Sequence, residues 1–144
     1  MYSILVLGAH PDDETMLAGG TLALLSSRGW QVHIVAATRG EGGVMGDPPI
    51  CHREELGAIR EQELRCAARA LGAASVAFLG YVDPTVGPDE ELYPFEADFG
   101  RLAGQIQAAI REVRADVVLT HGQDGEYGHP AHRLVHEATA AAIA

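Results

Sequence analysis

Hydrophobic and polar positions follow two recurring patterns along this chain, and together they predict four strand–helix pairs. Short, nearly continuous apolar runs predict strands that are buried on both faces. Apolar residues spaced three and four apart predict helices with one buried side. The expected strands are Tyr2–Gly8, Gln31–Ala37, Ser75–Gly80 and Asp116–Thr120. The expected helices run from Asp12 or Asp13 to about Arg28, over Arg53–Leu71, from about Phe95 to Arg114, and from His129 onward. A glycine-rich turn is expected over His121–Gly128, before the last helix.

Two long segments carry neither pattern and are predicted to be loops. They span residues 38–52 and 81–95, and both are rich in glycine and proline, which disfavour regular structure. Loops of this length inside a compact domain are commonly functional. We therefore expect these two segments to determine much of the substrate choice.

The alternation of strand and helix predicts an α/β fold with a mainly parallel sheet and helices on both faces. A strand order of 3-2-1-4 would place the first and fourth strands side by side, where the order of the strands reverses. Ligands bind at that position in such sheets, outside the carboxyl ends of the strands. The 144 residues are expected to form a single domain.

Composition and charge exclude several classes of partner. The net charge of −10 argues against binding to nucleic acid or to an anionic membrane, because neither attracts an acidic surface. No apolar run approaches the roughly 18 residues that a membrane span needs. The first residues begin a strand directly, without a basic, signal-like segment. The chain is therefore expected to be cytoplasmic.

The first candidate site follows the first predicted strand, where His10, Asp12, Asp13 and Glu14 lie at a strand-to-helix junction. Imidazole and carboxylate groups both suit a divalent metal such as zinc. His10 and Asp13 are the expected ligands, and Asp12 between them is free for proton transfer. Taken alone, the acids are equally well explained as residues that cap the start of a helix.

A second candidate cluster follows the fourth predicted strand and decides between these readings. His129 and His132 are three residues apart, so they share one side of a helix whose first turn accommodates Pro130. Two histidines and one carboxylate leave an open position on a metal, which is typical of a catalytic site. His136, one turn beyond His132, and His121 are lower-ranked alternative ligands.

The sequence resembles the LmbE-like (PIG-L) family of N-acetylglucosaminyl deacetylases. The resemblance rests on Ala-His-Pro-Asp-Asp-Glu at residues 9–14 together with Gly-His-Pro-x-His at residues 128–132. Further matching motifs are Thr-Arg-Gly-Glu at 38–41, Arg60-x-x-Glu63, and Gly-Tyr-x-Asp at 80–83. The resemblance implies a three-layer α/β/α, Rossmann-like fold and a metal that is usually zinc, with other divalent metals possible.

The family also implies a reaction and a role for individual residues. The expected reaction is hydrolysis of the N-acetyl group of a small N-acetylglucosamine-type sugar or conjugate by a metal-bound water. The implied roles are metal ligation by His10, Asp13 and His132, general-base catalysis by Asp12, stabilisation of the oxyanion or assistance to the leaving amine by His129, sugar contacts by Arg60 and Asp83, and lining of the entrance by Tyr127.

The chain departs from the family pattern in two respects. Ala131 stands where the family usually has aspartate, so His129 is expected to be less basic and less firmly held, unless a nearby acid such as Asp124 or Glu126 substitutes for that aspartate. Family members also usually continue past the last predicted helix, so the chain is either a minimal version or lacks a C-terminal segment. The apolar end of that helix suggests a contact between subunits, so assembly into a homo-oligomer is kept as an alternative to a monomer.

Three other functions remain as alternatives. Ala131 and the short length leave open a degenerate metal-binding protein without catalytic activity. A dinucleotide-binding domain is disfavoured because no Gly-x-Gly-x-x-Gly follows the first predicted strand. A non-haem iron oxygenase shares the two-histidine, one-carboxylate ligand set but matches the expected fold poorly.

Overall fold

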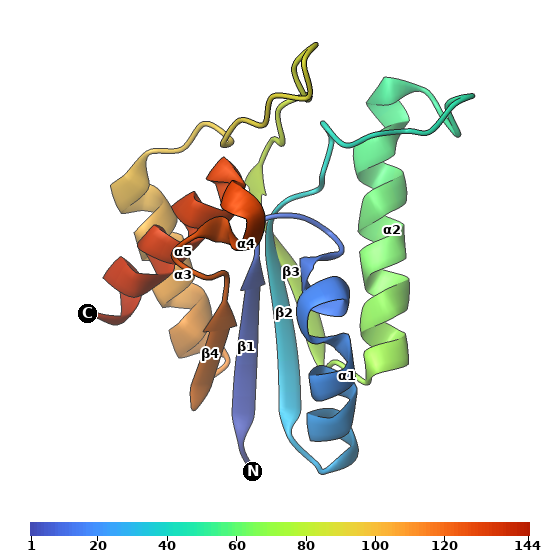
Figure 1. Ribbon diagram of the computed structural model, residues 1–144. Helices are drawn as coiled ribbons and strands as arrows, with labels where there is room; N and C mark the ends of the chain where they lie inside the picture. The colour runs from blue at the N-terminus through green and yellow to red at the C-terminus, as the bar shows by residue number, and fades with distance from the viewer.

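A parallel sheet of four strands forms the centre of the protein, with helices on both faces (Figure 1). The computed structural model describes residues 1–144. The strands are β1 (Ser3–Gly8), β2 (Gln31–Thr38), β3 (Ser75–Tyr81) and β4 (Val117–Thr120). The helices are α1 (Asp13–Ser27), α2 (Arg53–Leu71), α3 (Phe99–Glu112), α4 (Gly125–Gly128) and α5 (Pro130–Ile143). The strand order β3-β2-β1-β4 confirms the predicted order and the three-layer α/β/α class.

Side chains of the central strands alternate between two apolar layers. Helices α1 and α2 cover one face of the sheet, and α3 and α5 cover the other (Figure 1). On β1, Ile4 and Val6 belong to the first layer, whereas Leu5 and Leu7 belong to the second. Both faces are buried, which explains why these strands read as continuous apolar runs in the sequence. Burying each such side chain stabilises the fold by roughly 1.5–3 kcal/mol.

Helix α3 begins at Phe99, four residues later than the hydrophobic pattern predicts. Asp98 caps this helix, since its side chain accepts a hydrogen bond from the backbone N–H of Arg101 at 2.7 Å. Phe95 nevertheless packs into the same apolar layer as Leu102 from the preceding loop. Phe95 therefore continues the apolar spacing of the helix in the sequence although it lies in a loop. The predicted start of the helix at Phe95 is wrong.

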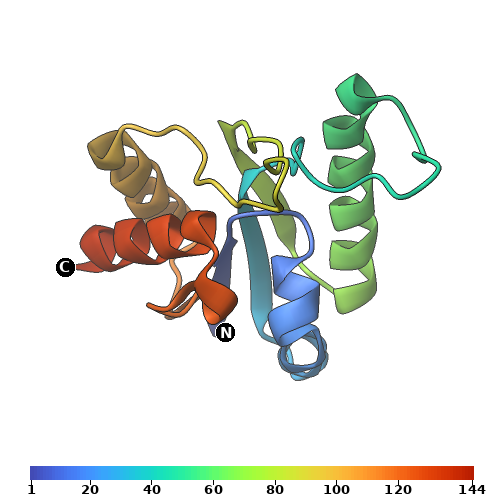
Figure 2. The same ribbon diagram turned by 45° about the horizontal axis from the view of Figure 1, so that its top comes forward.

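The segment after β4 also differs from the predicted turn, because residues 125–128 form the short helix α4. Glu126 interrupts that helix with a positive φ of 62°. Pairing of Leu7 on β1 with Thr120 on β4 places the ends of these strands side by side. The turn after β1 therefore lies beside α4 and the start of α5, with the two long loops extending above the same edge (Figure 2).

None of the helices has both the length and the apolar content needed to span a membrane.

Candidate metal centre

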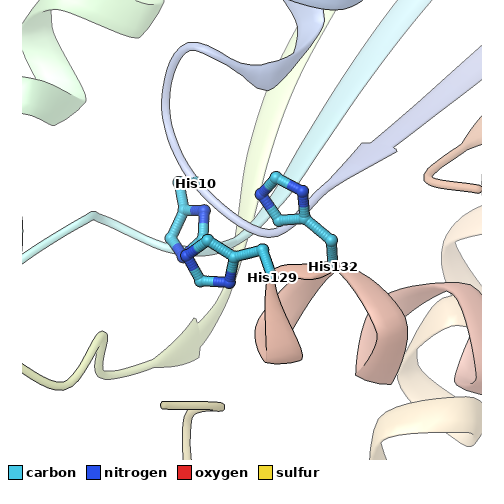
Figure 3. A group of neighbouring side chains, drawn as sticks. All are labelled: His10, His129 and His132. Atoms are coloured by element: carbon cyan, nitrogen blue, oxygen red, sulfur yellow. The ribbon is translucent and has the colours of Figure 1, made fainter. Parts of the chain in front are cut away.

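Three histidines converge where the carboxyl ends of β1 and β4 meet (Figure 3). His10 comes from the turn after β1, while His129 and His132 come from the start of α5. The ring of His129 lies 4.8 Å from that of His10 and 4.4 Å from that of His132, measured between centroids. All three side chains are buried. The strand order therefore brings the two sequence motifs together, as predicted.

Asp13 lies beside these rings and is held by the turn from which α1 begins. Its Oδ2 accepts hydrogen bonds from the backbone N–H groups of Ala9 and His10, both at 2.8 Å. The ring of His121 lies 3.1 Å from the same oxygen. Burial would raise the pKa of Asp13, but its close contacts with the imidazoles of His121 and His132 prevail and hold that pKa well below its usual range. The carboxylate is therefore charged, and Oδ1 is left to face the histidines.

His132 has the arrangement expected of a metal ligand. Its Nδ1 lies 2.6 Å from Glu126 Oε2, so this nitrogen carries the proton and donates it. Its Nε2 is buried without a hydrogen-bond partner, although Asp13 Oδ1 lies 3.3 Å away. A buried lone pair facing a carboxylate oxygen is stabilised by a shared cation. These atoms therefore fit a divalent metal.

His10 is oriented by a second carboxylate. Its Nε2 lies 3.1 Å from Asp83 Oδ1, and its Nδ1 lies 3.7 Å from Asp13 Oδ2. The side chains form two groups that could hold a metal, and these groups have His132 in common: His10–His129–His132 and Asp13–His121–His132. The predicted trio of His10, Asp13 and His132 draws its members from both groups.

His129 differs from the other two histidines in its hydrogen bonding. Its Nδ1 accepts from the backbone N–H of Ala131 at 3.2 Å, so the ring proton resides on Nε2. Burial, followed by the neighbouring imidazoles of His10 and His132, lowers the pKa of His129 to about 4. The ring is therefore neutral at pH 7 and presents an N–H donor to the site. This arrangement suits a hydrogen bond to an oxyanion better than metal ligation.

Asp12 faces the cleft from a strained position just before α1. Its φ of 139° is rare for a residue with a side chain, and such strain is often found at functional sites. Burial raises the pKa of Asp12, while the nearby guanidinium of Arg60 partly opposes the shift. A raised pKa brings a carboxylate closer to the range in which a general base works at neutral pH.

Arg60 is held by the backbone of two loops rather than left free in the cleft. Its guanidinium donates to the carbonyl oxygens of Gly40 at 3.0 Å and Pro11 at 2.7 Å. It also forms an ion pair with Asp12 at 3.1 Å. Gly40 permits this approach, because a β-carbon there would lie 2.0 Å from Arg60 Nη1. The predicted sugar contact of Arg60 would have to coexist with these bonds.

The cleft above the histidines has a volume of about 510 Å³. Loop residues on two sides approach closely, since a β-carbon at Gly42 would lie 1.9 Å from the carbonyl oxygen of Pro84. Tyr127 lines the cleft and is 71% exposed. Its role at the entrance stays a prediction. A larger groove of about 1320 Å³ beside β3 and α5 contains none of the histidines and is a separate feature.

The structure also shows which of the other histidines lie close to the candidate metal site. His136 bonds to the backbone oxygen of His121 at 2.8 Å and takes no part in either ligand group. His52 caps helix α2. His121 and Glu126, by contrast, are central to the site, yet the sequence analysis gave them minor places. Their direct position after β4 was the available signal.

Comparisons with known proteins agree with this geometry. Residues 5–143 match the PIG-L family, described as GlcNAc-PI de-N-acetylase. The 1D-myo-inositol 2-acetamido-2-deoxy-alpha-D-glucopyranoside deacetylase of Mycobacterium leprae is 40% identical over 153 residues, covering 98% of this chain and 50% of the relative. The chain thus spans about half the length of the curated relatives it matches.

Two solved structures have the same fold. The N,N'-diacetylchitobiose deacetylase of Pyrococcus horikoshii has a TM-score of 0.77 and 27% identity, covering 98% of this chain and 49% of that one. GalB, the 4-carboxy-2-hydroxymuconate hydratase of Pseudomonas putida KT2440, has a TM-score of 0.79 and 29% identity, covering 99% and 55%. The fold therefore supports more than one reaction, and the extent of the sequence match shows that this chain belongs to the PIG-L family of GlcNAc-PI de-N-acetylases.

Proposed function

We propose that this chain carries the catalytic centre of a metal-dependent N-deacetylase acting on an uncharged N-acetylglucosamine-type conjugate. The observation that carries the proposal is the unpartnered, buried Nε2 of His132 facing Asp13 Oδ1. His10, Asp13 and His132 would hold the metal, and zinc suits their nitrogen and oxygen atoms. The names of the relatives support the choice of an N-acetyl amino sugar.

Amide hydrolysis needs a nucleophile, a proton acceptor and a means of stabilising negative charge. A bound divalent cation supplies Lewis-acid chemistry and lowers the pKa of water to about 7. Asp12 lines the same cleft and would accept the proton of the attacking water. It would later pass that proton to the departing amine, acid–base assistance worth about 10²–10⁴ in rate.

His129 would stabilise the negative charge that develops on the acetyl oxygen. Its Nδ1 is occupied by the N–H of Ala131, so its Nε2–H is the group available to donate. The bond to the backbone fixes the ring without the aspartate that the family usually has at position 131. Donors preorganised for an oxyanion are typically worth about 10²–10³ in kcat.

The charge of the cleft favours a substrate without phosphate or other anionic groups. Three carboxylates line it, those of Asp12, Asp13 and Asp83, whereas Arg60 is the one basic lining residue apart from the histidines. The donors of that arginine are directed at carbonyl oxygens and Asp12. Asp13 and the neighbouring carboxylates would already offset the charge of the metal, so an anionic aglycone would find no free side-chain cation in the cleft to pair with.

Acetate release by the zinc-supplemented chain tests the proposal. The substrates are an N-acetylglucosaminyl inositol and the same compound phosphorylated on the inositol. We expect turnover of the neutral compound, a clearly lower kcat/KM for the phosphorylated one, and a loss of about 10²-fold or more in Asp12→Asn. Glu112→Gln is the matched control, because Glu112 is exposed at the far end of α3.

Each contrary result identifies the part of the proposal that fails. Acetate release that is unaffected in Asp12→Asn would exclude Asp12 as the base. Zinc binding without acetate release from either compound would favour the degenerate metal-binding alternative. Equal kcat/KM values for both compounds would overturn the preference for an uncharged conjugate.

A further inference from the structure

Glu126 connects two histidines that the proposed reaction does not itself use as acid or base. Its Oε2 lies 2.6 Å from His132 Nδ1 and 3.0 Å from His121 Nδ1. The two imidazole rings are stacked, with centroids 3.8 Å apart and planes 13° apart. At their other ends, both Nε2 atoms face the carboxylate of Asp13, at 3.1 Å from His121 and 3.3 Å from His132. The stacked pair is therefore held between two carboxylates.

The backbone of Glu126 is shaped for this contact. Its φ of 62° interrupts α4, and residues other than glycine rarely adopt such a conformation. The side chain of Asp124 accepts from the N–H of Glu126 at 3.1 Å and steadies the kink. The second carboxylate oxygen, Oε1, accepts from the N–H of Gly122 at 2.9 Å. Both oxygens are thus engaged, and the carboxylate has a fixed orientation.

We propose that Glu126 is a positioning residue for the metal centre, acting directly on His132. Accepting the Nδ1 proton of His132 leaves the lone pair on Nε2, the atom that faces Asp13. Carboxylates that orient a metal-bound histidine in this way typically contribute 10–100-fold to metal affinity or activity. The inference rests on the proposed function, since it assigns the role of Glu126 relative to that metal site.

The structure also changes the role expected of Glu126 from the sequence. There, Glu126 and Asp124 are the acids expected to be able to substitute for the aspartate missing at position 131, by acting on His129. In the structure the hydrogen bond of His129 goes to Ala131, and Glu126 serves His121 and His132 instead.

Glutamine cannot replace this carboxylate without reversing a hydrogen bond. A glutamate accepts at both oxygens, whereas an amide accepts at one end and donates at the other. If the amide oxygen kept the N–H of Gly122, its NH₂ group would face the imidazoles and favour protonation of His132 on Nε2. If the amide were flipped, its NH₂ group would face the N–H of Gly122. Glu126→Gln is therefore a nearly isosteric variant that changes the orienting interaction.

The test compares the wild type, Glu126→Gln, Glu126→Ala and Glu137→Gln. Glu137 is a matched control, since it lies on the same helix as His132 and forms no hydrogen bond or ion pair with a histidine. Nitrogen-15 imidazole spectra of the metal-free protein, at a pH of about 9 where free histidines are neutral, report the tautomer of His132. Competition with a chromophoric chelator then gives the zinc affinity.

We expect the Nδ1–H tautomer of His132 in the wild type and Glu137→Gln, and its loss in both Glu126 variants. Zinc affinity should fall roughly 10–100-fold in Glu126→Gln and stay unchanged in the control. An unaltered tautomer together with wild-type zinc affinity in Glu126→Gln would overturn the proposal. If the wild type binds no zinc, the proposed metal site fails, while the tautomer spectra still decide whether Glu126 orients His132. Glu126→Gln retains the shape of the side chain, so a folding defect confined to Glu126→Ala leaves the comparison intact.

Discussion

Gly40→Ala should destabilise the protein by displacing the guanidinium of Arg60 from the two loops it joins. A β-carbon at position 40 would lie 2.0 Å from Arg60 Nη1 and 2.5 Å from its Cζ. The φ of Gly40 is also positive, at 67°, which is unfavourable for alanine whatever the surrounding space. The substitution therefore combines a local backbone cost with the loss of partly buried hydrogen bonds.

The magnitude follows from these two parts. The left-handed conformation costs alanine roughly 1–2 kcal/mol. Losing the hydrogen bonds from the guanidinium to the carbonyl oxygens of Gly40 and Pro11 adds about 3 kcal/mol, at the lower value of about 1.5 for each bond from a charged donor. The ion pair with Asp12 adds little, because the side chain of Asp12 is 57% exposed. The expected total is about 4–5 kcal/mol.

Gly29→Ala is the matched control. Gly29 has a similar φ of 82°, but nothing lies within 4 Å of the β-carbon that alanine would add. Only the backbone cost of about 1–2 kcal/mol is expected there. For a domain of this size the difference of about 3 kcal/mol between the variants corresponds to roughly 6–12 °C in Tm.

Thermal and denaturant unfolding measure both variants, alone and in an Arg60→Ala background. When the arginine is absent, Gly40→Ala should cost no more than Gly29→Ala, since no guanidinium remains to be displaced. Equal destabilisation by the two glycine variants in the native background would refute the reasoning.

Two further predictions concern the base and the core. Arg60→Ala should move the acidic limb of the pH profile of kcat/KM to higher pH. The charge of Arg60 lowers the pKa of Asp12, and this base must be ionised to act. An acidic limb that stays in place or moves to lower pH would contradict this coupling. Leu102→Ala should cost about 2–5 kcal/mol in denaturant unfolding, since Leu102 is fully buried. Phe99→Ala on the same helix, where Phe99 is 44% exposed, is the control and should cost clearly less.

Much of the fold could be predicted from the sequence because its signals are local. The apolar runs that became β1 and β2, and the glycines that end α1 and α2, mark their elements without reference to the rest of the chain. The strand order then placed His10 and His132 at one edge of the sheet, and the structure shows them together. The start of α3 was misplaced because Phe95 is buried from a loop, and apolar spacing cannot distinguish that from a helical turn.

The finer organisation of the site depends on contacts that no local pattern encodes. Glu126 reaches His121 and His132 only because its backbone adopts a positive φ, for which a glutamate gives no sequence signal. Arg60 turns to the backbone because Gly40, distant in sequence, leaves room for it. The sequence therefore indicated the residue types of the candidate metal centre, while the structure was needed to see how the surrounding carboxylates orient them.

The central claim is that His132 and its neighbours hold a metal. The most direct test is the zinc content per chain after zinc supplementation and desalting, for the wild type, His132→Ala and His136→Ala. His136 is the control, because its ring bonds to the backbone of His121 and lies outside both ligand groups. The account predicts one zinc per chain in the wild type and His136→Ala, and its loss in His132→Ala. A wild type without zinc, or a His132→Ala variant that keeps it, would contradict the account.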